Sequence, residues 1–381
     1  MNLKSRRVFM FANYTPADRS IGITKKICSE INTLRNLGYE VYYSAYDEDG
    51  VSIFGNKDEV SLHKVFPFKY DRLNKLMRYY WLETTAYDFL KQNNNFILGY
   101  IRLGPPNSTL FKIFDLLKNG GAHIIAESLA YFPGIHYHSI QGKYIQMMHR
   151  MNHKKFKKYL DCFLVEGNMQ EMYSVPCYSM NMGVEVDSIT PHNYCGDKSE
   201  LNLISVANEN TYHAYDRIIK SLHEYVKNKG EKKVRIHLVG TISEETKRLI
   251  DQFQLGKYVV LYGKKSGEEL DKIYNLCNIG LGPFGQHRVG GKKDTGLKTK
   301  EYFAKGLPYI YSGEEPTVPK FYPYIKQFPS DESPIDFHEV WNFYQSFSHD
   351  ESVIQEMRKF AKENYSWDTI MREALSHVNW E

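Results

Sequence analysis

The sequence predicts an α/β protein with two domains, each built on a parallel, doubly wound sheet. Short apolar strands alternate with helical segments along the chain, which is the pattern of connected βαβ units. The alternation restarts after a polar stretch at 188–200, and the 381 residues exceed what one ordinary core accommodates. Because ligands of such sheets bind at the carboxyl ends of the strands, we expect the chemistry in a cleft between the two domains.

The first domain is predicted to begin with a strand, a loop that contains glycine, and a helix. Ile27, Ile31 and Leu34 recur at helical spacing, and Gly38 ends this segment before the next strand. The same order of elements then continues along the domain. Strands are expected at 6–14, 40–46, 95–102, 123–128 and 161–167, and a helix at 108–121 is among the segments that separate them.

The second domain repeats the pattern of strand and helix. Strands are expected at 201–208, 234–240, 258–263 and 278–284, with a helix at 215–230 that ends in glycine. The last stretch of the chain has a helical pattern throughout. We therefore place the first domain at 1–192, the second at 197–350, and a C-terminal helical segment at 351–381.

Composition and charge exclude several classes of protein. The formal net charge is only +4, so we expect no nucleic acid as a partner. The five cysteines are scattered without CxxC spacing, which is typical of a reduced cytosolic protein without a zinc site. No apolar stretch approaches the ~18 residues needed to span a bilayer, and the run near the N-terminus is too short for a signal peptide. We expect a cytoplasmic protein that can lie on the inner face of the membrane.

A glycine-rich basic loop follows the strand at 278–284 and runs into a short helix. Glycines let backbone N–H groups approach a ligand closely, and the positive end of the helix that follows points at the same place. Asp294 or Thr295 is expected to cap this helix, and Gly306 ends it. Glu301 then stands about 8–10 Å from the helix N-terminus, roughly the distance from a pyrophosphate to the ribose of one nucleotide. The loop therefore predicts a site for a nucleotide diphosphate.

The residues alone leave a second interpretation of this stretch open. A loop rich in glycine and lysine is often a solvated surface loop, and such loops are weak signals by themselves. Glu301 would then pair with Lys298 or Lys305, which lie at helical spacing from it.

Six segments of the chain resemble a known family of enzymes. They are 22–41, 100–128, 180–189, 204–222, 297–312 and 365–367, and the fifth reads LKTKEYFAKGLPYIYS. Together they resemble the GT-B-fold glycosyltransferases of family 4, especially bacterial enzymes of capsule and exopolysaccharide assembly. The resemblance implies two Rossmann-like domains facing across a cleft, with a C-terminal helix that crosses back to the first domain.

The resemblance also implies an activity, namely retaining transfer of a hexose-type sugar from a nucleotide-diphosphate sugar to a growing cell-surface polysaccharide or a lipid-linked acceptor. It implies neither a bound metal nor a cofactor, because basic residues and a helix N-terminus stabilise the leaving diphosphate. Glu301 would contact the ribose, Lys298 would act on the diphosphate, and Gly22 would face the sugar. The expected donor-binding residues are Gly22, Asn208, His213, Arg288, Gly291, Thr295, Gly296, Leu297, Lys298, Thr299 and Glu301.

The sequence departs from the family pattern at two places. Many relatives carry a second glutamate eight positions before the equivalent of Glu301, where Lys293 stands here. The Arg and Lys that commonly hold the phosphate appear as Asn208 and His213. These departures keep a non-catalytic GT-B subunit, which binds and stabilises a partner glycosyltransferase, as an alternative function. A nucleotide-sugar epimerase or a phosphorylase on the same scaffold is a further alternative.

In the first domain, Glu127 ends a predicted strand and is a candidate catalytic residue, acting on the sugar or on the acceptor hydroxyl. The alternative is a carboxylate paired with Arg102. Arg102 and His136 are expected on the acceptor side, although histidines at such positions are often surface residues. The stretch 147–160 mixes lysines with Met and Phe, and as a helix it would either lie on an anionic membrane or pack on the sheet.

Overall fold

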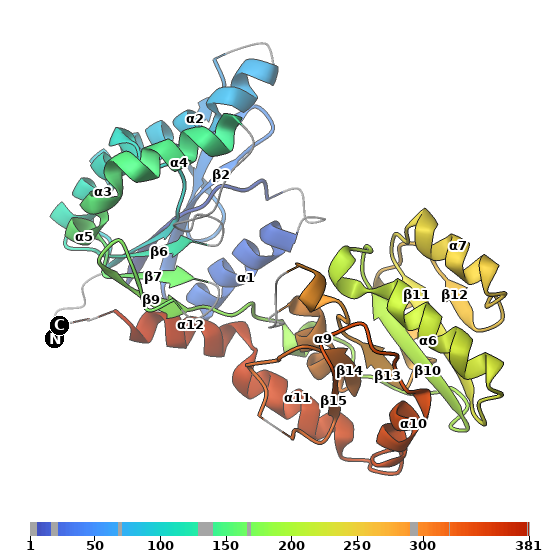
Figure 1. The fold of residues 1–381 in the computed structure, drawn as a ribbon. Helices are drawn as coiled ribbons and strands as arrows, with labels where there is room; N and C mark the ends of the chain where they lie inside the picture. Colours follow the sequence, from blue (N-terminus) through green and yellow to red (C-terminus); the bar gives the residue numbers. More distant parts are fainter. Residues whose placement is uncertain are drawn as a thin grey trace. The chain divides into compact units, whose positions relative to one another are not determined.

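The computed structural model describes residues 6–16, 22–67, 71–128, 140–165, 169–289, 296–319, 321–378 and 380, with the backbone alone for 22, 71–76, 140 and 141. The chain divides into one unit of Met1–Asn181 with Trp367–Glu381 and another of Met182–Ser366. The sequence predicts this boundary at 192–197 and one C-terminal segment at 351–381. The structure instead divides that segment between helix α11 (Val353–Asn364) of the second unit and helix α12 (Trp367–Ser376) of the first (Figure 1).

The sheet of the first unit has the strand order β4-β3-β2-β1-β5-β6-β7-β9-β8. Its centre, from β2 to β9, is parallel as the sequence predicts, whereas the β2–β3, β3–β4 and β8–β9 pairs are antiparallel. Strands β3, β4, β8 and β9 are not among the strands that the sequence predicts. The strands are β1 (Arg7–Phe11), β2 (Glu40–Tyr46), β3 (Gly50–Phe54), β4 (Val60–Val65), β5 (Leu98–Arg102), β6 (His123–Ser128), β7 (Cys162–Val165), β8 (Glu171–Met172) and β9 (Val175–Ser179).

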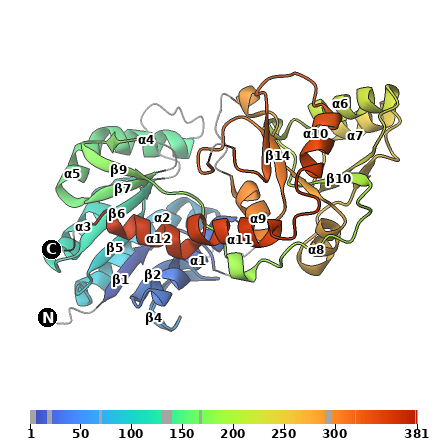
Figure 2. The ribbon, with the colours of Figure 1, turned by 90° about the horizontal axis from the view of Figure 1, so that it is seen from below.

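Helices cover both faces of this sheet, because successive side chains of a strand point to opposite faces. Val8 and Met10 of β1 pack with residues of α1 and α12, whereas Phe9 and Phe11 pack with residues of α2, α3 and α5. Helix α12 therefore completes the core of the first unit (Figures 1 and 2). The helices are α1 (Gly22–Asn36), α2 (Asp71–Gln92), α3 (Ser108–Asn119), α4 (Ile140–Asn152) and α5 (Phe156–Tyr159).

The sheet of the second unit is parallel throughout, in the order β12-β11-β10-β13-β14-β15. In chain order this is 3-2-1-4-5-6, the arrangement of a dinucleotide-binding fold, and its switch point lies between β10 and β13. The strands are β10 (Glu200–Val206), β11 (Lys233–Val239), β12 (Val259–Leu261), β13 (Ile279–Leu281), β14 (Tyr309–Ser312) and β15 (Ile325–Phe328). The other helices are α6 (Tyr215–Lys227), α7 (Glu244–Gln252), α8 (Gly267–Asn275), α9 (Leu297–Lys305) and α10 (Phe337–Gln345).

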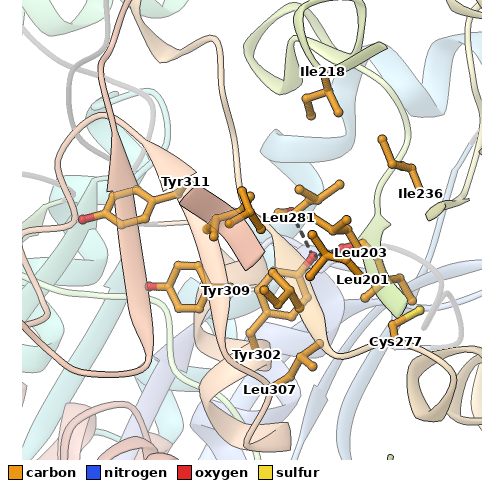
Figure 3. Packing of buried hydrophobic residues seen from close by; sticks show 14 of the residues in the cluster. Leu201, Leu203, Ile218, Ile236, Cys277, Leu281, Tyr302, Leu307, Tyr309 and Tyr311 are labelled. Atoms are coloured by element: carbon orange, nitrogen blue, oxygen red, sulfur yellow. Dashed lines mark hydrogen bonds between the residues drawn. The ribbon is translucent and has the colours of Figure 1, made fainter. Parts of the chain in front are cut away.

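Tyr302 fixes helix α9 over the switch point. Its buried ring lies among Leu201, Leu203 and Leu281, as Figure 3 shows. Its hydroxyl is 3.1 Å from the carbonyl oxygen of Ile204 in β10 and 3.0 Å from that of Leu281 in β13. The helix that follows the glycine-rich loop is therefore held at the ends of the two strands that flank the switch point.

A buried carboxyl group joins α2 to α3 in the first unit. Glu83 is fully buried, and its Oε2 accepts a hydrogen bond of 2.7 Å from the side-chain amide of Asn107, the N-cap of α3. Its Oε1 has no hydrogen-bond partner in the part of the chain that the structure describes. Burial raises the pKa of Glu83 to about 8, so this carboxyl group is mostly protonated at neutral pH.

Replacing Glu83 with Gln is expected to make the first unit more resistant to heat at alkaline pH. The pKa of Glu83 is about 8 in the folded state, whereas its ordinary value is 4.5. The stability contributed by the proton on Glu83 is therefore complete below pH 4.5 and is lost as the pH rises through 8. Between pH 7 and pH 9 the wild type loses about 1 kcal/mol that the Gln variant keeps. Calorimetric melting at both pH values measures the difference, with Glu48→Gln, an exposed site, as control. Equal pH slopes for Glu83→Gln and wild type would contradict the prediction.

Candidate functional site

A pocket of about 270 Å³ lies in the second unit at the carboxyl ends of β10 and β13. One wall follows β10 and the other comes from the loop after β13 and the first turn of α9. This is the switch point of the sheet, where ligands of open α/β sheets bind. The lining residues are Val206, Ala207, Tyr212, His213, Pro283, Gly296, Leu297, Lys298 and Glu301.

Helix α9 presents one face to this pocket. Leu297, Lys298 and Glu301 line it, because Glu301 lies four residues after Leu297 and three after Lys298, and residues at these spacings are neighbours on a helix surface; Tyr302 and Phe303 are instead buried in the core. Gly296 is the N-cap and gives no side-chain bond. The cap is therefore not Asp294 or Thr295, which the sequence predicts and which lie outside the described residues. Because the helix begins at Leu297, Glu301 lies about 6 Å along its axis from that residue, less than the roughly 8–10 Å expected from the sequence. The N-terminus of α9, with its partial positive charge, thus borders the pocket.

Two charged side chains of α9 lie in the pocket wall. The ammonium of Lys298 donates a hydrogen bond of 2.9 Å to Oγ of Ser205, which is 2.7 Å from the hydroxyl of Tyr215. Glu301 is half-buried one turn beyond Leu297. Lys305, which the sequence offered as an alternative partner of Glu301, forms an ion pair of 2.6 Å with Asp271.

His213 forms part of the opposite wall. It ends a short 3-10 turn (Thr211–His213), and its Nδ1 accepts a hydrogen bond of 3.0 Å from the backbone N–H of Asn210. Burial, with a smaller contribution from Lys298, lowers the pKa of His213 to about 3. The imidazole is therefore neutral at physiological pH and carries its proton on Nε2.

Three other expected donor-binding residues, Thr299, Asn208 and Arg288, are not among the residues that line the pocket. Thr299 is buried, and its hydroxyl donates to Glu315 at 3.1 Å. The side-chain oxygen of Asn208 accepts a bond of 3.2 Å from the backbone N–H of Thr241.

Arg288 lines a second cavity, of about 460 Å³, rather than the first. There its guanidinium pairs with Asp216 at 2.6 Å and with Glu332 at 2.5 Å. Arg288 thus forms ion pairs with carboxylates of its own unit, and the composition of the loop alone does not predict these partners.

Four further residues of the sequence analysis are described in part or not at all. Gly22 begins α1 in the first unit, with its backbone alone described. Gly291, Thr295 and His136 lie outside the described residues.

Glu127 and Arg102 belong to a buried charge cluster at the carboxyl edge of the first sheet. They are register partners on β6 and β5, and Nη1 of Arg102 donates to Oε2 of Glu127 at 2.8 Å. The ammonium of Lys26 contacts both Glu127 and Glu30, and burial raises the pKa of Glu30. Both oxygens of Glu127 are thus engaged and the residue is 2% exposed, which favours the ion-pair interpretation over that of a free catalytic base.

Lys26 and Glu30 are not among the site residues that the sequence predicts. Their i, i+4 spacing in α1 was the available signal, but such pairs are usually surface features. In the part of the chain that the structure describes, no group of three or more His, Cys, Asp or Glu side chains is arranged to hold a metal ion.

The stretch 147–160 is not one helix. Helix α4 ends at Asn152, a 3-10 turn spans His153–Lys155, and α5 follows. His153 and Asn152 place their side chains on backbone carbonyls of the last turn of α4, which competes with continuation of the helix. Phe156 and Tyr159 pack in the core, as the packing alternative predicts, and no described helix is long and apolar enough to cross a membrane.

Comparison with solved structures shows that the chain has the two-domain GT-B fold of glycosyltransferases. A glycosyltransferase from Rickettsia africae superposes with a TM-score of 0.63 at 12% identity, over 98% of this chain and 97% of that one. The catalytic domain of starch synthase IV from Arabidopsis thaliana, bound to ADP and acarbose, gives 0.59 at 11% identity over 97% and 98%. The Anabaena protein HepE in complex with UDP gives 0.54 at 11% identity over 98% and 100%. No family model and no curated sequence matches the chain.

Proposed function

We propose that the protein is a retaining glycosyltransferase that transfers a hexose-type sugar from a nucleotide-diphosphate sugar to a growing cell-surface polysaccharide or a lipid-linked acceptor. The pocket at the switch point of the second unit carries this proposal. It combines a helix N-terminus and Lys298, which suit a diphosphate, with Glu301 one turn farther along the helix, which suits a ribose.

In this proposal, the pocket stabilises the leaving group of the reaction. As the bond between the anomeric carbon and the diphosphate oxygen breaks, negative charge grows on the diphosphate. Lys298 and the N-terminus of α9 stabilise that charge without a metal or a cofactor. Two solved structures of this fold contain UDP or ADP, which supports the class of donor. Retention and the polysaccharide product rest on the resemblance of 297–312 and the other segments to the family.

A panel of UDP, ADP and GDP sugars tests the proposal. We expect at least one to raise the melting temperature, because a ligand that binds only the folded state stabilises it. The same compound is expected to be slowly hydrolysed or transferred, and proton NMR of the product should show the anomeric configuration of the donor. Binding without any turnover would instead favour the non-catalytic subunit, and binding of none of the panel would reject both.

We also propose that the enzyme associates with an anionic membrane through α4 and the basic turn after it. Tyr144, Met147 and Met151 recur along α4 at intervals of three and four residues and are 47%, 48% and 69% exposed. The lysines of 154–158 are exposed just beyond them, although Lys158 is 3.7 Å from Asp115. Exposed apolar side chains beside several cations suit the headgroup region of a bilayer.

Replacing Lys154, Lys155, Lys157 and Lys158 with Gln is expected to release the protein from anionic vesicles. Each lysine near the surface contributes about 1 kcal/mol, so binding should weaken steeply as salt rises. Co-sedimentation across a salt series measures this. The matched control replaces four exposed lysines of the second unit: Lys227, Lys229, Lys257 and Lys264.

A second variant separates the apolar contribution from the charge. Met147→Gln with Met151→Gln should weaken vesicle binding at every salt concentration, because insertion of apolar groups is not screened. Wild-type protein that stays wholly in the supernatant at low salt would end the membrane proposal and leave the transferase proposal intact.

A further inference from the structure

His213 stands in the pocket where the family resemblance leads one to expect a permanent cation. Asn208, at the other such position, is outside the pocket lining and accepts a backbone hydrogen bond from Thr241. Lys298 is therefore the one cationic side chain among the described residues that line the pocket. A diphosphate bound here needs hydrogen-bond donors in addition to this charge.

The ring of His213 is held in one orientation. Its Nδ1 accepts a hydrogen bond from the backbone N–H of Asn210, and its ring packs against two aromatic neighbours, with ring centroids 4.3 Å from Tyr212 and 5.4 Å from Tyr215. The Tyr215 ring lies nearly parallel to it, at 13°.

The other ring nitrogen is available to a ligand. An imidazole that accepts at Nδ1 carries its proton on Nε2. In the part of the chain that the structure describes, Nε2 of His213 has no hydrogen-bond partner. His213 lines the pocket and is only 2% exposed, but Nε2 is not one of the fully buried polar atoms that lack a partner, so the small exposed surface of this residue includes Nε2.

We propose that His213 donates its Nε2–H to an oxygen of the bound diphosphate as a neutral hydrogen-bond donor, in place of a permanent cation. This deepens the proposed function and rests on it. Burial lowers the pKa of His213 to about 3, which agrees with a neutral ring. The positive charge of the pocket then lies on Lys298 and the N-terminus of α9, the two groups proposed to stabilise the leaving diphosphate.

Two substitutions separate this role from the role of His213 in the turn. His213→Asn keeps an acceptor near the position of Nδ1, and with it the bond from Asn210, but has no donor at the position of Nε2. His213→Gln reaches the position of Nε2 with an amide N–H but no longer matches Nδ1. A hydrogen bond to a charged group is worth at least a factor of about 10 in affinity.

We expect His213→Asn to bind UDP or ADP about tenfold more weakly than wild type while binding uridine or adenosine equally. His213→Gln should retain more of the diphosphate affinity than His213→Asn. His192→Asn is the matched control, because this buried histidine of the same unit bonds the backbone carbonyl oxygens of Tyr274 and Cys277 and is not among the residues that line the pocket. Circular dichroism and melting temperature verify the fold of each variant.

The opposite ranking, with unchanged diphosphate binding in His213→Asn and weak binding in His213→Gln, would show that the histidine serves the turn alone and would overturn the inference. Nitrogen-15 NMR of the wild type gives a test without substitution, since the proton should be on Nε2 and its signal should shift on addition of UDP or ADP. A proton on Nδ1, or no shift with bound nucleotide, also overturns it. Wild-type protein that binds neither nucleotide rejects the proposed function and this inference together, whereas normal nucleotide binding with an unaffected His213→Asn variant rejects this inference alone.

Discussion

Glu301→Gln is expected to weaken nucleotide binding by a factor of about 10 to 100 while the melting temperature stays close to that of wild type. The carboxylate lines the pocket one helical turn from the N-terminus of α9, and we propose that it accepts hydrogen bonds from the two ribose hydroxyls. Hydrogen bonds to a charged group are worth about 1.5–3 kcal/mol, which gives this range. The half-buried side chain contributes little to the core, so folding should be preserved.

Titration calorimetry with UDP or ADP and with the matching 2′-deoxy nucleotide measures the effect and assigns it. Wild type should bind the 2′-deoxy nucleotide more weakly than the nucleotide with its 2′-hydroxyl. Glu301→Gln should show little of this difference, because the substitution and the missing hydroxyl each remove the same hydrogen bond. Glu269→Gln on α8, an exposed carboxylate paired with Lys265, is the control. If Glu301→Gln bound the nucleotide as tightly as wild type, Glu301 would have no contact with the ribose.

The parallel centres of both sheets could be predicted from the sequence because their strands are short, apolar and separated by helices. Strands such as β10 and β11 are bounded by clear turn signals, and their side chains are buried on both faces. The β3–β4 hairpin escaped prediction because β4 lies at the sheet edge, and its residues are mostly exposed and include Ser, His and Lys, a pattern that a loop also shows. The division of the C-terminal segment between two units depends on contacts with α1 and α9, which no local pattern encodes.

Helical spacing could predict the part of the pocket that one helix carries, whereas His213 on the opposite wall was expected only from the family resemblance. Gly296, Leu297, Lys298 and Glu301 are close in sequence, so helical spacing was enough to bring them together. Arg288 precedes the same helix and was also expected at the donor, yet its position is set by Asp216 and Glu332, which are 72 and 44 residues away in the sequence. In the charge cluster of the first unit, the Glu127–Arg102 pair was one of two expected alternatives, but Lys26 and Glu30 were not expected, since burial of charged side chains depends on tertiary contacts.

Lys298→Ala is expected to lower the transfer rate by a factor of about 100 to 1,000, the usual effect of removing one group that stabilises developing negative charge. Affinity for the intact nucleotide sugar should fall by less than about tenfold, because the diphosphate gains its extra charge only as the bond to the sugar breaks. Pre-steady-state turnover, with the donor affinity measured separately, resolves the two effects.

Because Lys298 also forms a hydrogen bond with Ser205, this experiment needs controls that separate a structural role of the lysine from its role at the diphosphate. Ser205 lies between the ammonium and the hydroxyl of Tyr215, so the lysine also ties α9 to the end of β10. Ser205→Ala removes that tie but keeps the ammonium, and it should reduce the rate far less than Lys298→Ala. Lys298→Arg keeps a positive charge in a different geometry and should recover part of the rate. A Lys298→Ala variant that melts earlier but transfers sugar at the wild-type rate would show that the lysine holds the helix to the strand and does not act on the diphosphate.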